Sequence, residues 1–117
     1  LVEIIRLNTP DECVCCKGIY DISDRSFIRK KDGRWYTEIH HVISLGNNKQ
    51  LDDEDNMVKL CPTCHKALKK GISSKDYQEG LIEKIYDNAP NVLDFAKHFF
   101  DTDNFKNIVE LTQQNLR

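Results

Sequence analysis

The spacing of apolar residues predicts a strand–strand–helix unit in the first two thirds of the chain. Residues 34–45 are rich in aromatic and β-branched side chains, which favour a strand, and the Asp-Gly pair at 32–33 is typical of a hairpin turn. Residues 57–60 form a second apolar run and predict another short strand. Because Pro62 suits the first turn of a helix, we expect a helix over 62–70. These elements indicate an α+β fold.

Beyond residue 71 the pattern changes to helical spacing. Ser73 and Ser74 are typical helix N-caps, and apolar residues then recur at intervals of three and four, with a break at 88–90. The apolar stripes comprise Tyr77, Leu81 and Ile85, then Val92, Phe95, Ala96 and Phe99, then Phe105, Ile108, Val109, Leu111 and Leu116. We therefore predict a core over 1–71 and a helical extension over 72–117 packed on it. The Phe-rich stripe is most simply interpreted as core, although a homodimer interface would look the same in the sequence.

Length and composition limit the classes of protein to which the chain can belong. Its 117 residues suit a single domain, and no apolar run approaches the roughly 20 residues of a membrane span. The chain begins at Leu1 rather than Met, so we expect it to be part of a longer protein with other domains. Four of the five cysteines stand in Cys-x-x-Cys pairs, which favours metal ligation in a reducing, cytoplasmic compartment.

The net charge of −2 hides an uneven distribution. Residues 1–75 carry 13 Lys and Arg against 11 Asp and Glu, whereas residues 76–117 carry 4 against 8. Five basic residues gather within ten positions, namely Arg25, Arg29, Lys30, Lys31 and Arg34. Such a cluster could neutralise DNA phosphates, although a solvated loop would have the same composition.

The cysteine pairs predict a structural zinc site. Cys13 and Cys16 lie in a short segment that ends in a glycine, as in a zinc knuckle, and Cys61 and Cys64 open the predicted helix. Four thiolates complete the tetrahedral shell of zinc and leave no open position, so this Cys₄ site would hold the fold together without reacting. Cys15 is surplus, either as a spectator thiol or as a competing ligand.

Three of the four histidines lie close to the second cysteine pair. His41 is followed by Asn56 after 14 intervening residues and by His65 after 8 more, and His40 adjoins His41. Imidazole can serve as a base near neutral pH and as a ligand for a divalent metal, so this group favours a second, open metal site. Neighbouring strand residues point to opposite faces, so the strand must end, twist or bulge at the histidine pair. The alternative is that His40 and His41 are ordinary sheet residues and that His65 extends the zinc site.

The sequence resembles the HNH endonuclease family. The similarity covers about residues 13–70 and rests on His-His-Val-Ile at 40–43, on Asn-Met-Val-Lys-Leu-Cys-Pro-Thr-Cys-His at 56–65, and on the flanking cysteine pairs. It implies a ββα-metal fold, here fastened by the Cys₄ zinc and extended by C-terminal helices. The chain departs from the family pattern at Ser44, where members often carry proline.

The same resemblance implies a role for each site residue. His41 would be the general base, and His40 and His65 would bind the catalytic divalent metal, Mg²⁺ or another ion. Asn56 would hold the loop that positions His41, or bind metal itself. Glu38 would assist the metal or hold an imidazole in its tautomer.

The resemblance also implies that the substrate is DNA. Candidate phosphate contacts are Arg29, Lys30, Lys31, Arg34, Lys66, Lys69 and Lys70. We expect hydrolysis of phosphodiester bonds by the cleavage domain of a restriction-type enzyme. The alternatives are a phage or mobile-element nuclease, and a zinc-dependent module that binds nucleic acid or protein without catalysis.

Overall fold

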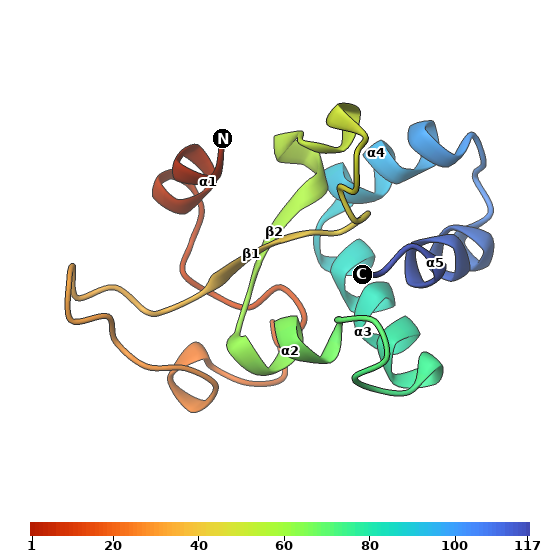
Figure 1. Cartoon of the computed structure of the whole chain (residues 1–117). Helices are drawn as coiled ribbons and strands as arrows, with labels where there is room; N and C mark the ends of the chain where they lie inside the picture. Colours follow the sequence, from red (N-terminus) through yellow and green to blue (C-terminus); the bar gives the residue numbers. More distant parts are fainter.

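A computed structural model describes all residues from 1 to 117. The chain forms a two-stranded sheet and five α-helices, linked by three single turns of 3-10 helix (Figure 1). In chain order they are α1 (Val2–Asn8), β1 (Glu38–His41), β2 (Met57–Leu60), α2 (Pro62–Ala67), α3 (Lys75–Asn88), α4 (Pro90–Phe100) and α5 (Phe105–Gln114). The predicted α+β class and the strand–strand–helix order are confirmed.

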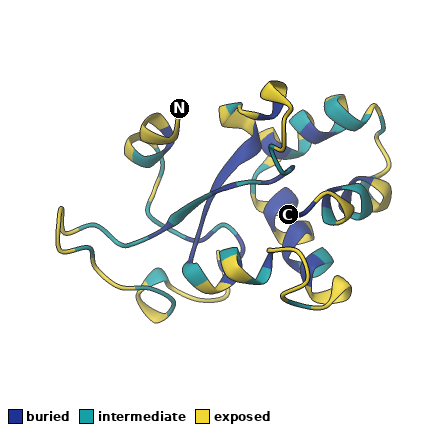
Figure 2. Cartoon of the chain, in the orientation of Figure 1, coloured by how far each residue is buried: buried dark blue, intermediate teal, exposed yellow.

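The two strands and α2 form a ββα unit at the centre of the molecule. β1 pairs antiparallel with β2, so that His40 lies opposite Val58 and His41 opposite Met57. All four residues of β2 are buried, and Figure 2 shows this strand enclosed by the other elements. α2 follows β2 after one residue, Cys61, whose side chain accepts a hydrogen bond from the Cys64 amide and caps the helix. The second cysteine pair therefore lies where strand and helix meet.

The first strand is shorter than the prediction over 34–45. Only residues 38–41 pair with β2, because from Val42 onward the chain bends away and its amides bond to Asn56. Val42 and Ile43 are 1 % exposed, so the β-branched residues that suggested a longer strand are buried as part of a loop. The β-branched composition of this segment therefore indicated that its side chains are buried, but not that its backbone pairs in a sheet.

The helix predicted over 62–70 is also shorter. α2 ends at Ala67, whose carbonyl oxygen accepts hydrogen bonds from Ser73 Oγ (2.6 Å) and Gln78 Nε2 (3.0 Å). These side chains satisfy the terminal carbonyl that a further helical turn would have used. Lys69 and Lys70 consequently lie beyond the helix, in the turn that leads to α3.

The predicted helical extension consists of α3, α4 and α5. Ser74 caps α3 by accepting a hydrogen bond from the Tyr77 amide, and Pro90 starts α4 directly after the predicted break. One continuous core joins these helices to the ββα unit: Ile82 and Ile85 of α3 belong to the same buried cluster as Leu60. The boundary at residue 71 stays a prediction, and the core crosses it.

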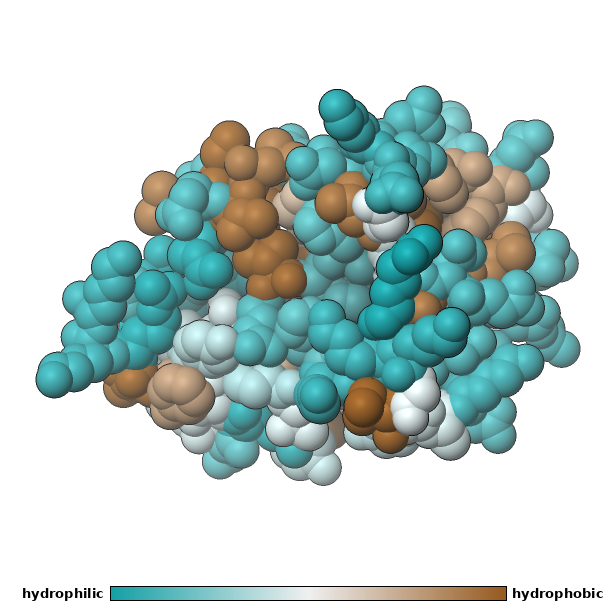
Figure 3. All heavy atoms as spheres, viewed as in Figure 1, coloured by the Kyte–Doolittle hydropathy of each residue, from teal (hydrophilic) through white to brown (hydrophobic).

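Two peripheral features complete the fold. Residues 27–36, here called the basic arm, project from the molecule on the left of Figure 1 and turn at Gly33, with Ile28 paired to Trp35. Above the arm in the same view, α1 carries exposed apolar side chains that form the brown area over this helix in Figure 3. No helix has the length and apolar character that a membrane crossing requires.

Candidate metal centres and active site

Four cysteines from two distant segments meet at one point. The sulfur atoms of Cys13, Cys16, Cys61 and Cys64 all lie within 4.8 Å of one another, and all four residues are buried. Cys16 Sγ lies 3.7 Å from Cys64 Sγ, close to the roughly 3.8 Å between sulfurs that each lie 2.3 Å from a tetrahedral zinc. The donor set and spacing therefore fit zinc, as the sequence predicted.

The surroundings of these cysteines suit a negatively charged centre. Hydrogen bonds from the sulfurs of Cys15, Cys61 and Cys64 lower the pKa of Cys13, which favours the thiolate that metal binding needs. Burial lowers the pKa of Arg25, but the nearby sulfurs of Cys61 and Cys16 outweigh burial and raise it. Arg25 thus sets a permanent positive charge beside the thiolates.

Cys15 adjoins the four cysteines but is not one of the grouped sulfurs. Its thiol donates a hydrogen bond to the carbonyl oxygen of Leu81 in α3 (3.6 Å), and the residue is 2 % exposed. The hydrogen bond to Cys13 and burial raise the pKa of the Cys15 thiol. These contacts suit a protonated packing residue.

A second group of donors comes from β1 and α2. The imidazole rings of His40 in β1 and His65 in α2 meet edge to face, with centroids 5.2 Å apart. His40 Nε2 is buried and has no hydrogen-bond partner. Burial first, and then the charges of His65, Lys69 and His41, lower the pKa of His40 to about 3. His40 therefore presents a neutral ring with an unpaired nitrogen, which is the form that binds a divalent cation.

Glu38 fixes the orientation of His65. One carboxylate oxygen lies 2.8 Å from His65 Nδ1, and the other accepts a hydrogen bond from Tyr36 Oη (2.6 Å). Burial raises the pKa of Glu38, but these two hydrogen bonds outweigh it and lower the pKa. Because a carboxylate only accepts hydrogen bonds, the His65 proton resides on Nδ1 and leaves Nε2 as the free donor atom. The pair repeats the carboxylate–histidine arrangement that supports metal ligands.

His41 reaches the same place from the end of the strand. β1 ends at His41, and a depression of about 240 Å³ is lined by His40, His41 and His65 together. His41 Nε2 lies 3.1 Å from Asp52 Oδ1, so the proton resides on Nε2 and Nδ1 is the basic atom. Because the strand ends at this point, the adjacent residues His40 and His41 can both line one site, as the sequence required.

Asn56 is fully buried and entirely engaged with the loop after β1. Its carboxamide oxygen accepts from the Ile43 amide (2.9 Å), and its nitrogen donates to the carbonyl oxygens of Ile43 (2.9 Å) and Leu51 (2.8 Å). Of the two roles left open for Asn56, these contacts favour holding the loop. No free oxygen faces the histidines.

The charged side chains that line the depression are all positive. Its lining includes two cationic side chains, Lys69 and Arg117, and no carboxylate. Glu38 and Asp52 contact the histidines but do not line the depression. The opening therefore has a positive character that suits an anionic ligand.

Comparison with known proteins agrees with this geometry. The family model described as HNH endonuclease matches residues 28–71. This segment is similar to HNH endonucleases. The HNH segment, as residues 28–71 are called below, contains the histidines, Asn56 and the second cysteine pair.

About half of the chain is also similar to a short part of a longer curated protein. The chain is 44% identical over 57 residues to the Type IV methyl-directed restriction enzyme EcoKMcrA of Escherichia coli (strain K12). The match covers 49% of this chain and 19% of the relative. No solved structure matches the chain.

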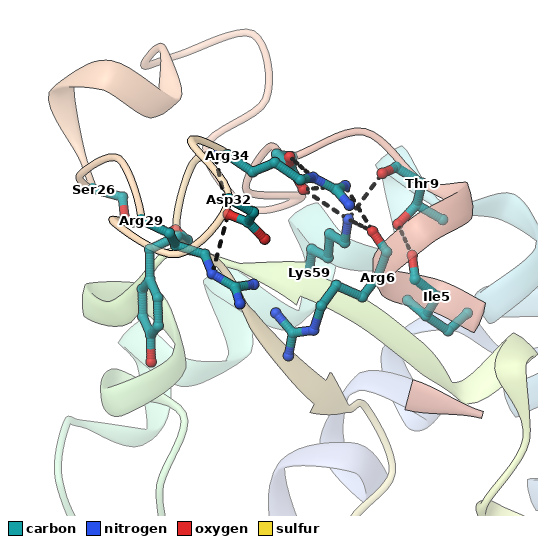
Figure 4. Close-up of polar contacts among 10 residues, drawn as sticks. Ile5, Arg6, Thr9, Ser26, Arg29, Asp32, Arg34 and Lys59 are labelled. Atoms are coloured by element: carbon teal, nitrogen blue, oxygen red, sulfur yellow. Dashed lines mark hydrogen bonds and ion pairs between the residues drawn. The ribbon is translucent and has the colours of Figure 1, made fainter. Parts of the chain in front are cut away.

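The predicted DNA contacts fall into two groups. Lys30, Lys31, Lys66, Lys69 and Lys70 are exposed, and Arg29 is half-buried with an ion pair to Asp32 at 3.5 Å. Arg34, in contrast, is taken up within the fold: its guanidinium donates two hydrogen bonds to Asp11 and one to the Arg6 carbonyl oxygen, beside buried Lys59 (Figure 4). The prediction for Arg34 therefore conflicts with its contacts, because the guanidinium donors face this network.

Two residues at the site were missed in the sequence. Asp52 belongs to a run of four acidic residues at 52–55, and nothing in such a run identifies the one that meets His41. Arg117 lies 52 positions beyond His65, outside the HNH segment, so no motif spacing points to it. The positions of Asp52 and Arg117 at the site depend on how the loop after β1 and the C-terminal helices pack against the ββα unit.

Proposed function

We propose that this chain is a metal-dependent DNA endonuclease domain of a restriction-type enzyme. His40 Nε2 is buried without a partner, the ring of His65 lies beside the ring of His40, and His41 lines the same depression. This single arrangement carries the proposal. An unpaired buried nitrogen is costly unless a ligand satisfies it. A divalent cation that accepts imidazole ligands fits that requirement, with His40 and His65 as its protein ligands.

His41 is the proposed general base. Asp52 holds the Nε2 proton, so Nδ1 removes a proton from a water molecule as that water attacks the phosphorus. The bond from phosphorus to the 3′ oxygen then breaks, and the departing oxygen takes a proton from solvent, which leaves a 5′-phosphate and a 3′-hydroxyl. A divalent cation bound by His40 and His65 would supply charge stabilisation for the phosphate and the leaving oxygen. Asn56 contributes by fixing the loop that carries Asp52, as a positioning residue.

Exposed basic side chains offer contacts to the DNA backbone. Lys66 and Lys70 adjoin the depression in sequence, and Lys30 and Lys31 extend the positive surface along the basic arm. Such contacts orient the duplex without reading its sequence. We propose that target selection comes from other domains or from a second copy of the chain.

The relative supports the biological setting of the proposal. EcoKMcrA is by its name a restriction enzyme, and its similarity to this chain includes 57 residues at 44% identity. We therefore favour restriction-type cleavage in the cytoplasm, where the free cysteines would remain reduced for zinc. A phage or mobile-element nuclease would use the same site in another context.

Plasmid nicking tests the proposal directly. Purified protein is incubated with supercoiled DNA and a series of divalent metals, alongside His41→Ala and His98→Ala variants. His98 is a matched control because it is an exposed histidine on α4. We expect metal-dependent nicking by the wild type and His98→Ala, and its loss in His41→Ala. A protein that retards DNA in a gel but never cuts it would instead be a binding module.

A further inference from the structure

Arg117 brings a cation from the C-terminal end of the chain to the histidine depression. It lines the depression with His41 and His65, although the HNH segment ends at residue 71. Its main chain is held in place, because the Lys70 amide donates to the Arg117 carbonyl oxygen (3.3 Å) and Leu116 is buried at 5 % exposure. The helical extension thus contributes a side chain to the site.

The guanidinium group lies against the loop that follows His41. A Cβ atom added to Gly46 would lie 2.9 Å from Arg117 Nη2, closer than side-chain atoms normally approach. Gly46 also has a φ of +52°, a conformation that favours glycine. Arg117 makes no ion pair with any carboxylate in the molecule, so its donors remain available.

We propose that Arg117 and Lys69 form a binding subsite for non-bridging oxygens of the scissile phosphodiester. The inference rests on the proposed nuclease function and adds to it a phosphate contact from outside the HNH segment. Two cations and no carboxylate line the opening, so a phosphate finds complementary charge there. The planar guanidinium can donate two parallel hydrogen bonds to phosphate oxygens, which lysine cannot do. Arg117 would thereby hold the phosphorus in line with the water at His41.

Salt-dependent DNA binding measures this contact apart from cleavage. Arg117→Ala and Arg117→Lys are prepared in the His41→Ala protein, together with Lys106→Ala as an exposed control on α5. Binding to a short fluorescein-labelled duplex is followed at increasing KCl. We expect the slope of log K against log salt to fall by about 1 for Arg117→Ala, and to be unchanged for Arg117→Lys and Lys106→Ala. An unchanged slope for Arg117→Ala would overturn the subsite.

Cleavage rates in the protein with His41 intact give the second measurement. We expect Arg117→Ala to lower the rate at saturating DNA by roughly 10- to 1000-fold, and Arg117→Lys to recover part of it. A rate for Arg117→Ala equal to that of the wild type would count against the contact.

The two proposals fail in different ways. If the wild type cuts no DNA with any divalent metal but the Arg117→Ala slope still falls, the nuclease function is wrong and the phosphate subsite stands. If the wild type cuts and Arg117→Ala matches it in rate and salt slope, the subsite is wrong and the nuclease function stands. Thermal unfolding of each variant verifies that the fold is retained.

Discussion

Glu38 Oε1 lies 2.8 Å from Nδ1 of His65, and the contact joins the first residue of β1 to the middle of α2. It fixes the orientation of the ring, which meets the ring of His40 edge to face. Because a charged acceptor also makes an imidazole a stronger ligand, Glu38 should control metal affinity at the open site.

Glu38→Gln should therefore weaken divalent metal binding by roughly tenfold or more while zinc content remains unchanged. Titration calorimetry with Mn²⁺ on zinc-loaded protein measures the affinity. Glu83→Gln, an exposed residue on α3, is the control and should bind Mn²⁺ normally. Equal affinities for both variants would contradict the supporting role of Glu38.

Asp52→Asn should lower the cleavage rate without weakening DNA binding. Asparagine can present its NH₂ group to His41 Nε2 and so favour the wrong tautomer, which removes the basic atom from the depression. We expect a fall in kcat of roughly 10- to 1000-fold with little change in KM. Asp94→Asn, exposed on α4, should have no effect. A rise in KM at constant kcat would assign Asp52 to DNA binding instead.

Asn56→Ala should destabilise the protein more than any exposed substitution in the same loop. It removes three hydrogen bonds and leaves the buried amide and carbonyl of Ile43 without side-chain partners. We expect a loss of about 3 kcal/mol in the free energy of unfolding, measured with urea. Asn47→Ala, an exposed neighbour, is the control and should change it by less than about 0.5 kcal/mol.

Stability should decrease below neutral pH because of His40. Its pKa in the folded state is about 3, against a usual value of 6.5, so between these values the unfolded chain binds the proton and the folded chain does not. Stability is therefore fully present above about pH 6.5 and falls with pH toward 3. Between about pH 7.5 and 5.5 the wild type should lose roughly 1 kcal/mol more than His40→Gln. Parallel losses in the two proteins would show that His40 titrates normally.

Two adjacent cysteines should differ completely in their effect on zinc. Cys16→Ala removes one of the four grouped sulfurs, whereas Cys15→Ala removes a thiol outside that group, which bonds to Leu81. We expect the first variant to lose zinc and unfold at a lower temperature, and the second to retain one zinc per chain. Metal analysis after dialysis, together with thermal unfolding, decides between them. Zinc loss from Cys15→Ala would make Cys15 a ligand.

Local sequence patterns predicted most elements of this fold but not their ends. Pro62, Ser74 and Pro90 act through their own backbone or side chain, so the starts of α2, α3 and α4 were predictable. The end of α2 was predicted three residues too late because Gln78, eleven positions after Ala67, satisfies its carbonyl. Partners so distant along the chain leave no periodic signal.

Arg34 illustrates the same limit for charged residues. In the sequence it belongs to a basic cluster suited to DNA, yet in the fold it bonds to Asp11, 23 positions away. Burial raises the pKa of Asp11, but the hydrogen bonds from Arg34 and Lys59 outweigh it and lower the pKa. Charge counts cannot distinguish a cation that has such a partner from one that is free.

The sequence by itself determined which kinds of donor are present and in what order: paired thiols for zinc and a histidine group for a second metal. Ligand chemistry depends on residue type and short spacing, and both are visible along the chain. Only the tertiary structure decided which nitrogen of each imidazole is free and which distant charges surround it. Those choices depend on Glu38, Asp52 and Arg117, whose positions follow from strand pairing and helix packing rather than from any local pattern.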